Sequence, residues 1–336
     1  MKVGLVLGGG GLIGLGYHAG VLKALHEKGF DLRRADLIVG TSAGSVIASY
    51  FATGWPQESF YEYAHGRHPD AVVDPDEQRQ EVGRLFVPLW HSPGERARRT
   101  VGSVFAMASS RGYVPGAARL PARLRRAFPS GLYSTDETRL RFHEDLPRDF
   151  PQDPKLYISA ADIYTGRRVA FGAPGAPEAA LPDAVAASCA IPGVFPAVRI
   201  GDGRYVDGGI VSATSVDLAA QAGCDRILCI APLGYRKDGP IPIRDPRRWA
   251  PVVVRSAFAR SLRREVRAAR AEGAEVLVLR PWLADLAIHG TNSMRHHDRA
   301  AVAEGARAGA VRALEETDGH PVLEAMSAPH TRRKTS

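Results

Sequence analysis

Residues 3–14 read VGLVLGGGGLIG, a continuous apolar run followed at once by a run of glycines. An apolar run of this length bounded by glycine is typical of a strand buried on both faces. Apolar residues then recur at helical spacing over residues 15–26, and Gly29 is a typical helix stop. The stretch therefore predicts a strand, a glycine-rich turn and a helix. We expect no signal peptide, because glycines interrupt the apolar run and no small-residue cleavage site follows directly.

The same order of elements is repeated further along the chain. Leu37-Ile38-Val39 is a second short apolar run, and a glycine-containing turn and a helical pattern over residues 45–52 follow it. Two successive strand–helix units are typical of a parallel sheet whose crossover helices cover its faces. The predicted fold class is therefore α/β, with a mainly parallel central sheet and flanking helices. Further strands are expected at residues 156–160, 168–171, 204–206, 227–231 and 275–279, and further helices at residues 183–190, 216–222, 252–271 and 297–316.

The 336 residues, of which 45% are apolar and 24% charged, have the composition of a globular protein. Proline, glycine and arginine are frequent over residues 55–150, where no strand pattern stands out. We therefore expect one domain over residues 1–319, with a cap inserted at about 55–150, and a flexible tail at 320–336. No run of about 18 apolar residues predicts a transmembrane helix. Three cysteines without a C-x-x-C pair favour a reducing compartment such as the cytoplasm, and they disfavour a disulfide framework.

The net charge of +8 is concentrated in two basic blocks. Residues 96–126 hold eight arginines and no acidic residue, and residues 244–270 hold nine arginines against Asp245 and Glu265. Such blocks indicate an anionic partner, which could be a nucleic acid, a membrane surface or an anionic substrate. The alternative is an ordinary solvated surface, because arginines spaced four residues apart commonly form the outer face of an amphipathic helix.

The glycine run has two chemical interpretations. Glycine allows a backbone to approach a ligand closely, and the start of a helix offers free N–H groups to negative charge. Gly9, Gly10, Gly11 and Gly14 fit a dinucleotide-binding loop, but the next strand has no acidic residue at its end to bind a ribose. The same N–H groups suit the oxyanion formed in acyl transfer.

A G-x-S-x-G pattern follows the second predicted strand and reads Gly40-Thr41-Ser42-Ala43-Gly44. In a nucleophile elbow, a sharp turn between strand and helix exposes the serine, and small flanking residues let the two elements pack closely. A turn serine or a helix N-cap is the alternative. The strand before the pattern and the helix after it favour Ser42 as a nucleophile.

An acidic residue follows the strand predicted at residues 204–206, within Asp207-Gly208-Gly209. Asp-Gly is a common hairpin turn. However, α/β folds place their sites at strand ends, and a serine nucleophile needs a base. Either His289 or His296 would complete the order serine, acid, histidine, but neither lies in a tight motif. No spacing of paired metal ligands is present, so no metal is expected.

The three motifs, in this order, resemble the patatin-like phospholipases. The resemblance covers residues 3–50 and 156–231 and includes Ala187-Ser188-Cys189-Ala190-Ile191-Pro192-Gly193-Val194-Phe195-Pro196. It implies a three-layer patatin-like fold with an inserted helical cap, and a Ser-Asp dyad that works without histidine. In such a dyad Ser42 attacks an ester carbonyl, and Asp207 accepts the serine proton and later activates water. The backbone N–H groups of Gly9, Gly10 and Gly11 would form the oxyanion hole, and Gly14, Gly40, Gly44, Gly208 and Gly209 would support the motifs.

The sequence departs from the family pattern at the first motif. A basic residue usually precedes its last glycine, and this chain has Ile13 there. Ala213 and Ser215 also replace the asparagine and proline that commonly follow the D-G-G motif. These differences leave the backbone donors and the dyad in place.

The resemblance implies a lipid acyl hydrolase that cleaves carboxylic esters of phospholipids or related lipids. A lipid or ester is then the substrate, and no cofactor is needed. The basic blocks would suit peripheral contact with an anionic membrane surface, with a solvated helix face as the alternative. We expect no nucleic-acid partner, because no recognisable binding motif is present. Two alternatives stay open: a transacylase that uses the same acyl-enzyme, and a nucleotide-binding module that uses the glycine loop.

Overall fold

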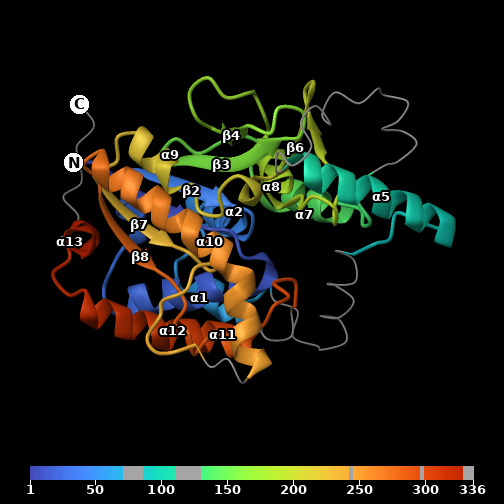
Figure 1. Cartoon of the computed structure of the whole chain (residues 1–336). Helices are drawn as coiled ribbons and strands as arrows, with labels where there is room; N and C mark the ends of the chain where they lie inside the picture. The colour runs from blue at the N-terminus through green and yellow to red at the C-terminus, as the bar shows by residue number, and fades with distance from the viewer. Residues whose placement is uncertain (71–85, 111–129, 242–244, 296–298, 328–336) are drawn as a thin grey trace.

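The computed structural model describes residues 1–70, 86–110, 130–241, 245–295 and 299–327 (Figure 1). It confirms the predicted fold class, because one sheet of eight strands has the order β5-β6-β3-β2-β1-β7-β8, with β4 paired to β3. Five strands run parallel to one another: β1 (Val3–Leu7), β2 (Leu37–Thr41), β3 (Lys155–Asp162), β7 (Arg226–Ile230) and β8 (Glu275–Leu279). Three strands add antiparallel pairings at one edge: β4 (Arg168–Phe171), β5 (Val198–Ile200) and β6 (Gly203–Asp207).

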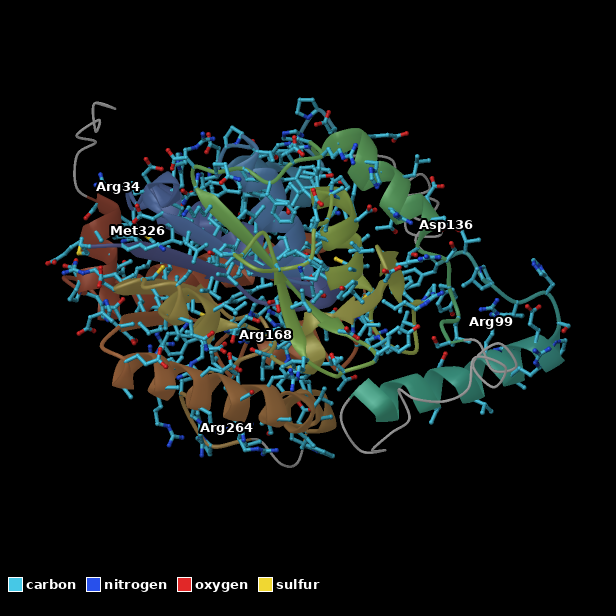
Figure 2. The ribbon with its side chains drawn as sticks, turned by 90° about the horizontal axis from the view of Figure 1, so that it is seen from above. Arg34, Arg99, Asp136, Arg168, Arg264 and Met326 are labelled. Atoms are coloured by element: carbon cyan, nitrogen blue, oxygen red, sulfur yellow. The ribbon has the colours of Figure 1, made fainter. Side chains whose placement is uncertain are left out.

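Helices cover both faces of the sheet, which makes three layers (Figure 1). One face packs against α1 (Gly11–Glu27), α2 (Ala43–Ala52), α8 (Leu181–Cys189) and α12 (Arg299–Glu316). The other face packs against α9 (Val216–Gln221) and α10 (Pro246–Ala271). Figure 2 shows Arg264 on the side of α10 that is turned away from the sheet.

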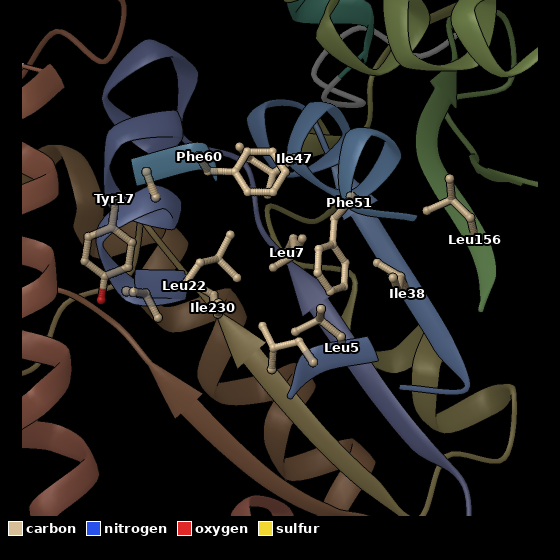
Figure 3. Close-up of a cluster of buried hydrophobic side chains, with 14 of the residues drawn as sticks. Leu5, Leu7, Tyr17, Leu22, Ile38, Ile47, Phe51, Phe60, Leu156 and Ile230 are labelled. Atoms are coloured by element: carbon tan, nitrogen blue, oxygen red, sulfur yellow. The ribbon is translucent and has the colours of Figure 1, made fainter. Parts of the chain in front are cut away.

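The core follows from the alternation of side chains along β1. Leu5 and Leu7 belong to the cluster under α1 and α2, whereas Val6 belongs to the cluster under α9 and α10. Successive strand residues point to opposite faces, so a fully apolar strand can supply both cores. Figure 3 shows Leu5 and Leu7 beside Phe51 of α2 and Leu22 of α1.

The segment expected to form a cap divides into parts with different surroundings. It contains α3 (Ser59–Ala64), α5 (Pro93–Ser110) and α7 (Asp136–Asp145). Phe60 and Tyr61 of α3 are buried in the main core, so this helix is part of the body of the domain. α5 extends outward from that body (Figure 1). Residues 71–85 and 111–129 of the predicted cap lie outside the described residues.

The predicted flexible tail is wrong over its first residues. α13 (Pro321–Ser327) is a helix, and Val322, Leu323 and Met326 are buried in the main core. These apolar side chains stabilise the helix by burial, a contribution that the short local sequence does not reveal. Residues 328–336 of the predicted tail lie outside the described part of the chain.

Short elements complete the fold. They are the 3-10 helices η1 (Leu32–Arg34) and η3 (Gly208–Ile210) and the helix α11 (Leu286–His289). Within the described residues, no helix has both the length and the apolar character needed to cross a bilayer.

Candidate active site

Ser42 occupies a sharp turn between β2 and α2. Its φ is 52° and its ψ is −123°, a region that residues with a side chain rarely adopt. A Cβ atom at Gly44 would lie 1.9 Å from the carbonyl oxygen of Leu7, and one at Gly40 would lie 2.6 Å from Cα of Ser45. Both positions therefore need glycine, because α2 packs directly against the ends of β1 and β2.

The strand register brings Asp207 to Ser42. Thr41 of β2 is paired with Ser159 of β3, and the next residue, Ala160, is paired with Asp207 of β6. The Ser42 hydroxyl lies near the Asp207 carboxylate and favours its ionised form. The backbone holds this carboxylate as well, since the N–H of Gly209 donates to Oδ1 at 2.7 Å.

The environment makes Asp207 a stronger base than an ordinary carboxylate. Burial raises the pKa of Asp207 to about 6, while the Ser42 hydroxyl and the hydrogen bond from the Gly209 N–H oppose the shift. A base in this range is ionised at neutral pH and can still accept a proton. The thiol of Cys189 stays protonated beside it, because burial and then the Asp207 charge raise the pKa of Cys189 to about 12.

The glycine loop lies against Ser42. A Cβ atom at Gly9 would lie 3.3 Å from Cβ of Ser42. The N–H of Gly9, however, donates to the carbonyl of Ala213 at 2.7 Å. Gly9 therefore fixes the loop and has no free donor for a substrate, which corrects its predicted place in the oxyanion hole.

The two following glycines retain free donors at the start of α1. No residue in the described part of the chain accepts a hydrogen bond from the N–H of Gly10 or Gly11. Gly11 has a φ of +61°, which favours glycine. Gly14 lies one turn into α1, where its N–H donates to the Gly10 carbonyl, and a Cβ atom at this position would lie 3.3 Å from Cβ of Ala43, the residue after Ser42.

Buried hydroxyl groups connect the segments of the site, and sequence reasoning did not identify them as functional. Oγ of Ser188 accepts from the N–H of Ser42 at 2.8 Å and donates to the carbonyl of Ser159 at 2.7 Å. The Ser215 hydroxyl donates to Oγ of Ser159 at 3.0 Å and lies 3.3 Å from Oγ1 of Thr41. Gly208 packs against Ser159, because a Cβ atom there would lie 2.6 Å from its carbonyl oxygen. The sequence signals were the run of hydroxyl residues after the D-G-G motif and, for Ser188, its place in the segment that resembles the family.

The described histidine candidate, His289, does not form a triad with Ser42 and Asp207, and neither does the buried His18 of α1. The buried ring of His289 packs edge-on against Tyr17 of α1, and burial lowers the pKa of His289 to about 3. Nε2 of His18 donates to the Gly8 carbonyl at 2.7 Å, and burial lowers the pKa of His18 to about 4. Both rings are therefore neutral and structural at neutral pH. His296 lies outside the described residues.

Ile13 is buried and leaves the glycine loop without a charge of its own. A cation nevertheless lies behind the loop, namely Arg255 of α10. The sequence did not predict that α10 would contact the glycine loop. Nη1 of the buried Arg255 donates to the carbonyl of Pro232 at 2.5 Å, and Cβ of Pro232 would lie 2.9 Å from a Cβ atom at Gly10. Burial lowers the pKa of Arg255 to about 10, so its guanidinium stays charged at neutral pH.

The two basic blocks have different surroundings. Of the first block, Arg96 stacks on Trp90 at 5.1 Å and Arg99 donates to the Gly131 carbonyl, while residues 111–126 lie outside the described part. In the second block, the arginines of α10 after Arg255 are exposed. Among the described residues, no group of three or more histidine, cysteine, aspartate or glutamate side chains could hold a metal ion.

Comparison with known proteins shows the family of the chain. The family model described as patatin-like phospholipase matches residues 5–220, more than half of the chain, and confirms the resemblance seen in the sequence. An uncharacterised NTE family protein of Mycobacterium tuberculosis is 26% identical over 68% of this chain and 30% of its own length. The uncharacterised protein YqhO of Bacillus subtilis is 27% identical over 63% of this chain and 65% of its own length. The chain thus spans about a third of the mycobacterial relative.

Two solved structures that align with this one have longer chains and low sequence identity to it. VipD from Legionella pneumophila is 16% identical, with a TM-score of 0.46 over 94% of this chain and 67% of VipD. The complex of ExoU and SpcU from the type III secretion system of Pseudomonas aeruginosa includes a chain that is 20% identical, with a TM-score of 0.37 over 97% of this chain and 52% of that one.

Proposed function

The chain belongs to the patatin-like phospholipase family, and on that premise we propose that it is a serine lipid acyl hydrolase. Its substrates are carboxylic esters of phospholipids or related lipids, and it needs no cofactor. The observation that carries the proposal is the buried pair of Ser42 and Asp207 beside the N–H groups of Gly10 and Gly11, which have no acceptor in the described part of the chain.

In the first half of the reaction, Oγ of Ser42 attacks the ester carbonyl carbon. Asp207 accepts the hydroxyl proton as the new C–O bond forms, and the carbonyl oxygen becomes an oxyanion. The N–H groups of Gly10 and Gly11 bind this oxyanion, and the N–H of Ala43 at the start of α2 is a third candidate donor. The tetrahedral intermediate collapses, the alcohol leaves with the proton from Asp207, and an acyl-Ser42 ester remains.

In the second half, water replaces the alcohol. Asp207 accepts a proton from water, the hydroxide attacks the acyl carbon, and the same N–H groups stabilise the second oxyanion. Collapse of the second intermediate releases the fatty acid, and the proton returns to Ser42. The buried cation of Arg255 behind the loop favours both oxyanions through its positive potential.

Hydrolysis and acyl transfer make different products from the same acyl-enzyme. We expect the purified protein, given phospholipid vesicles, to release free fatty acid in an amount that added glycerol or lysolipid does not change. Thin-layer chromatography or mass spectrometry of the products measures this ratio. Acyl product on the added alcohol, formed at the expense of fatty acid, would favour the transacylase instead.

We also propose that α10 binds an anionic membrane surface. Trp249, Val253 and Val254 near its start are 37%, 62% and 49% exposed, and Arg260 and Arg264 follow toward its end. Helical spacing places Trp249 and Val253 on the same face as the two arginines. α10 leads from the end of β7 to the start of β8, and these strands are parallel. Its apolar start therefore lies at the sheet edge where β2 leads into Ser42.

The membrane proposal predicts that charge reversal on α10 weakens binding to anionic vesicles. We expect Arg260→Glu/Arg264→Glu to reduce binding to phosphatidylserine-containing vesicles more than tenfold, because each basic residue near such a surface contributes about 1 kcal/mol. Vesicle sedimentation at rising salt, in a Ser42→Ala background that spares the lipid, measures this. Arg199→Glu/Arg204→Glu on the exposed β5–β6 hairpin is the matched control. Equal losses in both variants, or binding that salt does not weaken, would contradict the proposal.

A further inference from the structure

Glu265 is the one acidic residue in the sequence of the arginine-rich helix α10. Three hydroxyl groups donate hydrogen bonds to its carboxylate. Oε2 accepts from Oγ of Ser212 at 2.7 Å and from Oγ1 of Thr214 at 2.8 Å, and Oε1 accepts from Oγ of Ser261 at 3.0 Å. Hydrogen bonds to an ionised carboxylate are stronger than those between neutral groups. A helix on the outer layer thus binds a loop of the site, residues 212–215.

The Ser212 hydroxyl uses its full hydrogen-bonding capacity in this arrangement. Its proton goes to Glu265, and its oxygen accepts from the backbone N–H groups of Thr214 at 3.2 Å and Ser215 at 2.7 Å. A hydroxyl has one donor and two acceptor positions, so all three are occupied. Because Ser212 and Thr214 are buried, loss of the carboxylate would leave their donors without a partner.

The loop held by Glu265 contacts all three catalytic segments. The carbonyl of Ala213 accepts the N–H of Gly9, which lies against Ser42. The Ser215 side chain, held at a positive φ of 59°, reaches Thr41 before the nucleophile and Ser159 beside Asp207. One small pocket behind the glycine loop is lined by Gly9, Thr214 and Glu265 together.

We propose that Glu265 is a positioning residue for acyl transfer to Ser42. Its carboxylate fixes the 212–215 loop, and that loop sets the glycine loop and its free N–H groups against the nucleophile. The inference rests on the proposed function. It assigns to the otherwise basic helix α10 a role in the geometry of the site, in addition to any contact with lipid.

Replacement of Glu265 tests this role. We expect Glu265→Ala to lower kcat tenfold or more and to change KM less than about twofold, because small displacements of a reacting geometry cost rate more than binding. Glu265→Gln should keep most of the activity, because its amide oxygen can accept from Ser212 and Thr214 while its NH2 group donates to Oγ of Ser261. Ser212→Ala and Glu265→Ala should not be additive, because they break the same connection.

Asp36→Ala is the control for a merely structural loss. Oδ2 of Asp36 accepts the N–H of Val3 at 2.7 Å, at the end of β1 opposite the glycine loop. We expect this variant to lower Tm without lowering kcat. Amide hydrogen exchange over residues 8–14 adds a readout that needs no activity, and it should accelerate in Glu265→Ala but not in Asp36→Ala.

The proposal is overturned if Glu265→Ala keeps the wild-type kcat or the wild-type exchange rates over residues 8–14. It is also overturned if Asp36→Ala loses as much kcat at an equal loss of Tm. Failure of the proposed function is distinguishable, because the wild-type protein itself would then release no fatty acid.

Discussion

Replacing Ser42 with alanine is expected to reduce ester hydrolysis by at least about 10⁴-fold, because the variant cannot form the acyl-enzyme. The residual rate would come from the free N–H groups of the glycine loop and from substrate binding, which the substitution leaves in place. Initial rates with a short-chain ester and with phospholipid vesicles measure the loss.

The fold should survive this substitution. Ser42 donates its backbone N–H to Ser188, and alanine retains that bond. Its φ of 52° is strained for alanine as for serine, so we expect a Tm close to that of the wild type. Hydrolysis at more than about a hundredth of the wild-type rate in a folded Ser42→Ala protein would contradict a serine nucleophile.

Replacing Asp207 with asparagine is expected to lower kcat by about 10²–10⁴-fold, because the amide cannot accept the serine proton. The wild-type rate should depend on pH, because only ionised Asp207 can accept the serine proton. Asp207 with a pKa of about 6 is protonated and inactive below that pH, so kcat/KM should rise through about pH 6 and then level off. A pH–rate profile of wild type measures the step, and the residual activity of Asp207→Asn should lack it.

Asp207→Asn should also raise the stability of the folded protein at neutral and alkaline pH, although it lowers the activity. Asp207 ionises at about 6 in the fold but at 3.8 ordinarily, so the folded state binds its proton more tightly than the unfolded chain. Burial of the ionised carboxylate then costs about 3 kcal/mol above pH 6, and this cost disappears below pH 4. We expect Asp207→Asn to have a higher Tm than wild type at pH 8 and no such advantage at pH 4. Equal Tm differences at both pH values would contradict the burial of an ionised Asp207 carboxylate as the cause.

Local patterns predicted the elements that carry their own signal. The apolar runs of β1 and β2, each ending in glycine and followed by helical periodicity, were sufficient for the parallel core of the sheet. β5 was missed because three residues, Val198–Ile200, carry little pattern and depend on pairing with β6. α13 was missed because it depends on burial against the main core. α10 begins before the predicted residue 252, since Pro251 lies in its second turn and interrupts few helical bonds there.

The site divides in a similar way. The sequence predicted the motifs around Ser42 and Asp207, because each motif joins a strand end to a tight turn with glycines nearby. The engaged N–H of Gly9 could not be predicted, because its acceptor, Ala213, is 204 residues away and has no distinctive side chain. Ser188, Arg255 and Glu265 also reach the site only through the packing of α8 and α10. Sequence periodicity says which face of a helix is buried, but it does not say which loop that face will meet.

The central claim is that Ser42 is a nucleophile activated by Asp207. A fluorophosphonate probe followed by intact mass and peptide mapping tests it most directly, because the probe forms a covalent bond only with an activated serine. We predict one adduct per wild-type chain, located on Ser42, no adduct in Ser42→Ala, and labelling slowed by at least about tenfold in Asp207→Asn. Labelling of Ser42→Ala at the wild-type rate, or an adduct mapped to another residue, would contradict the account.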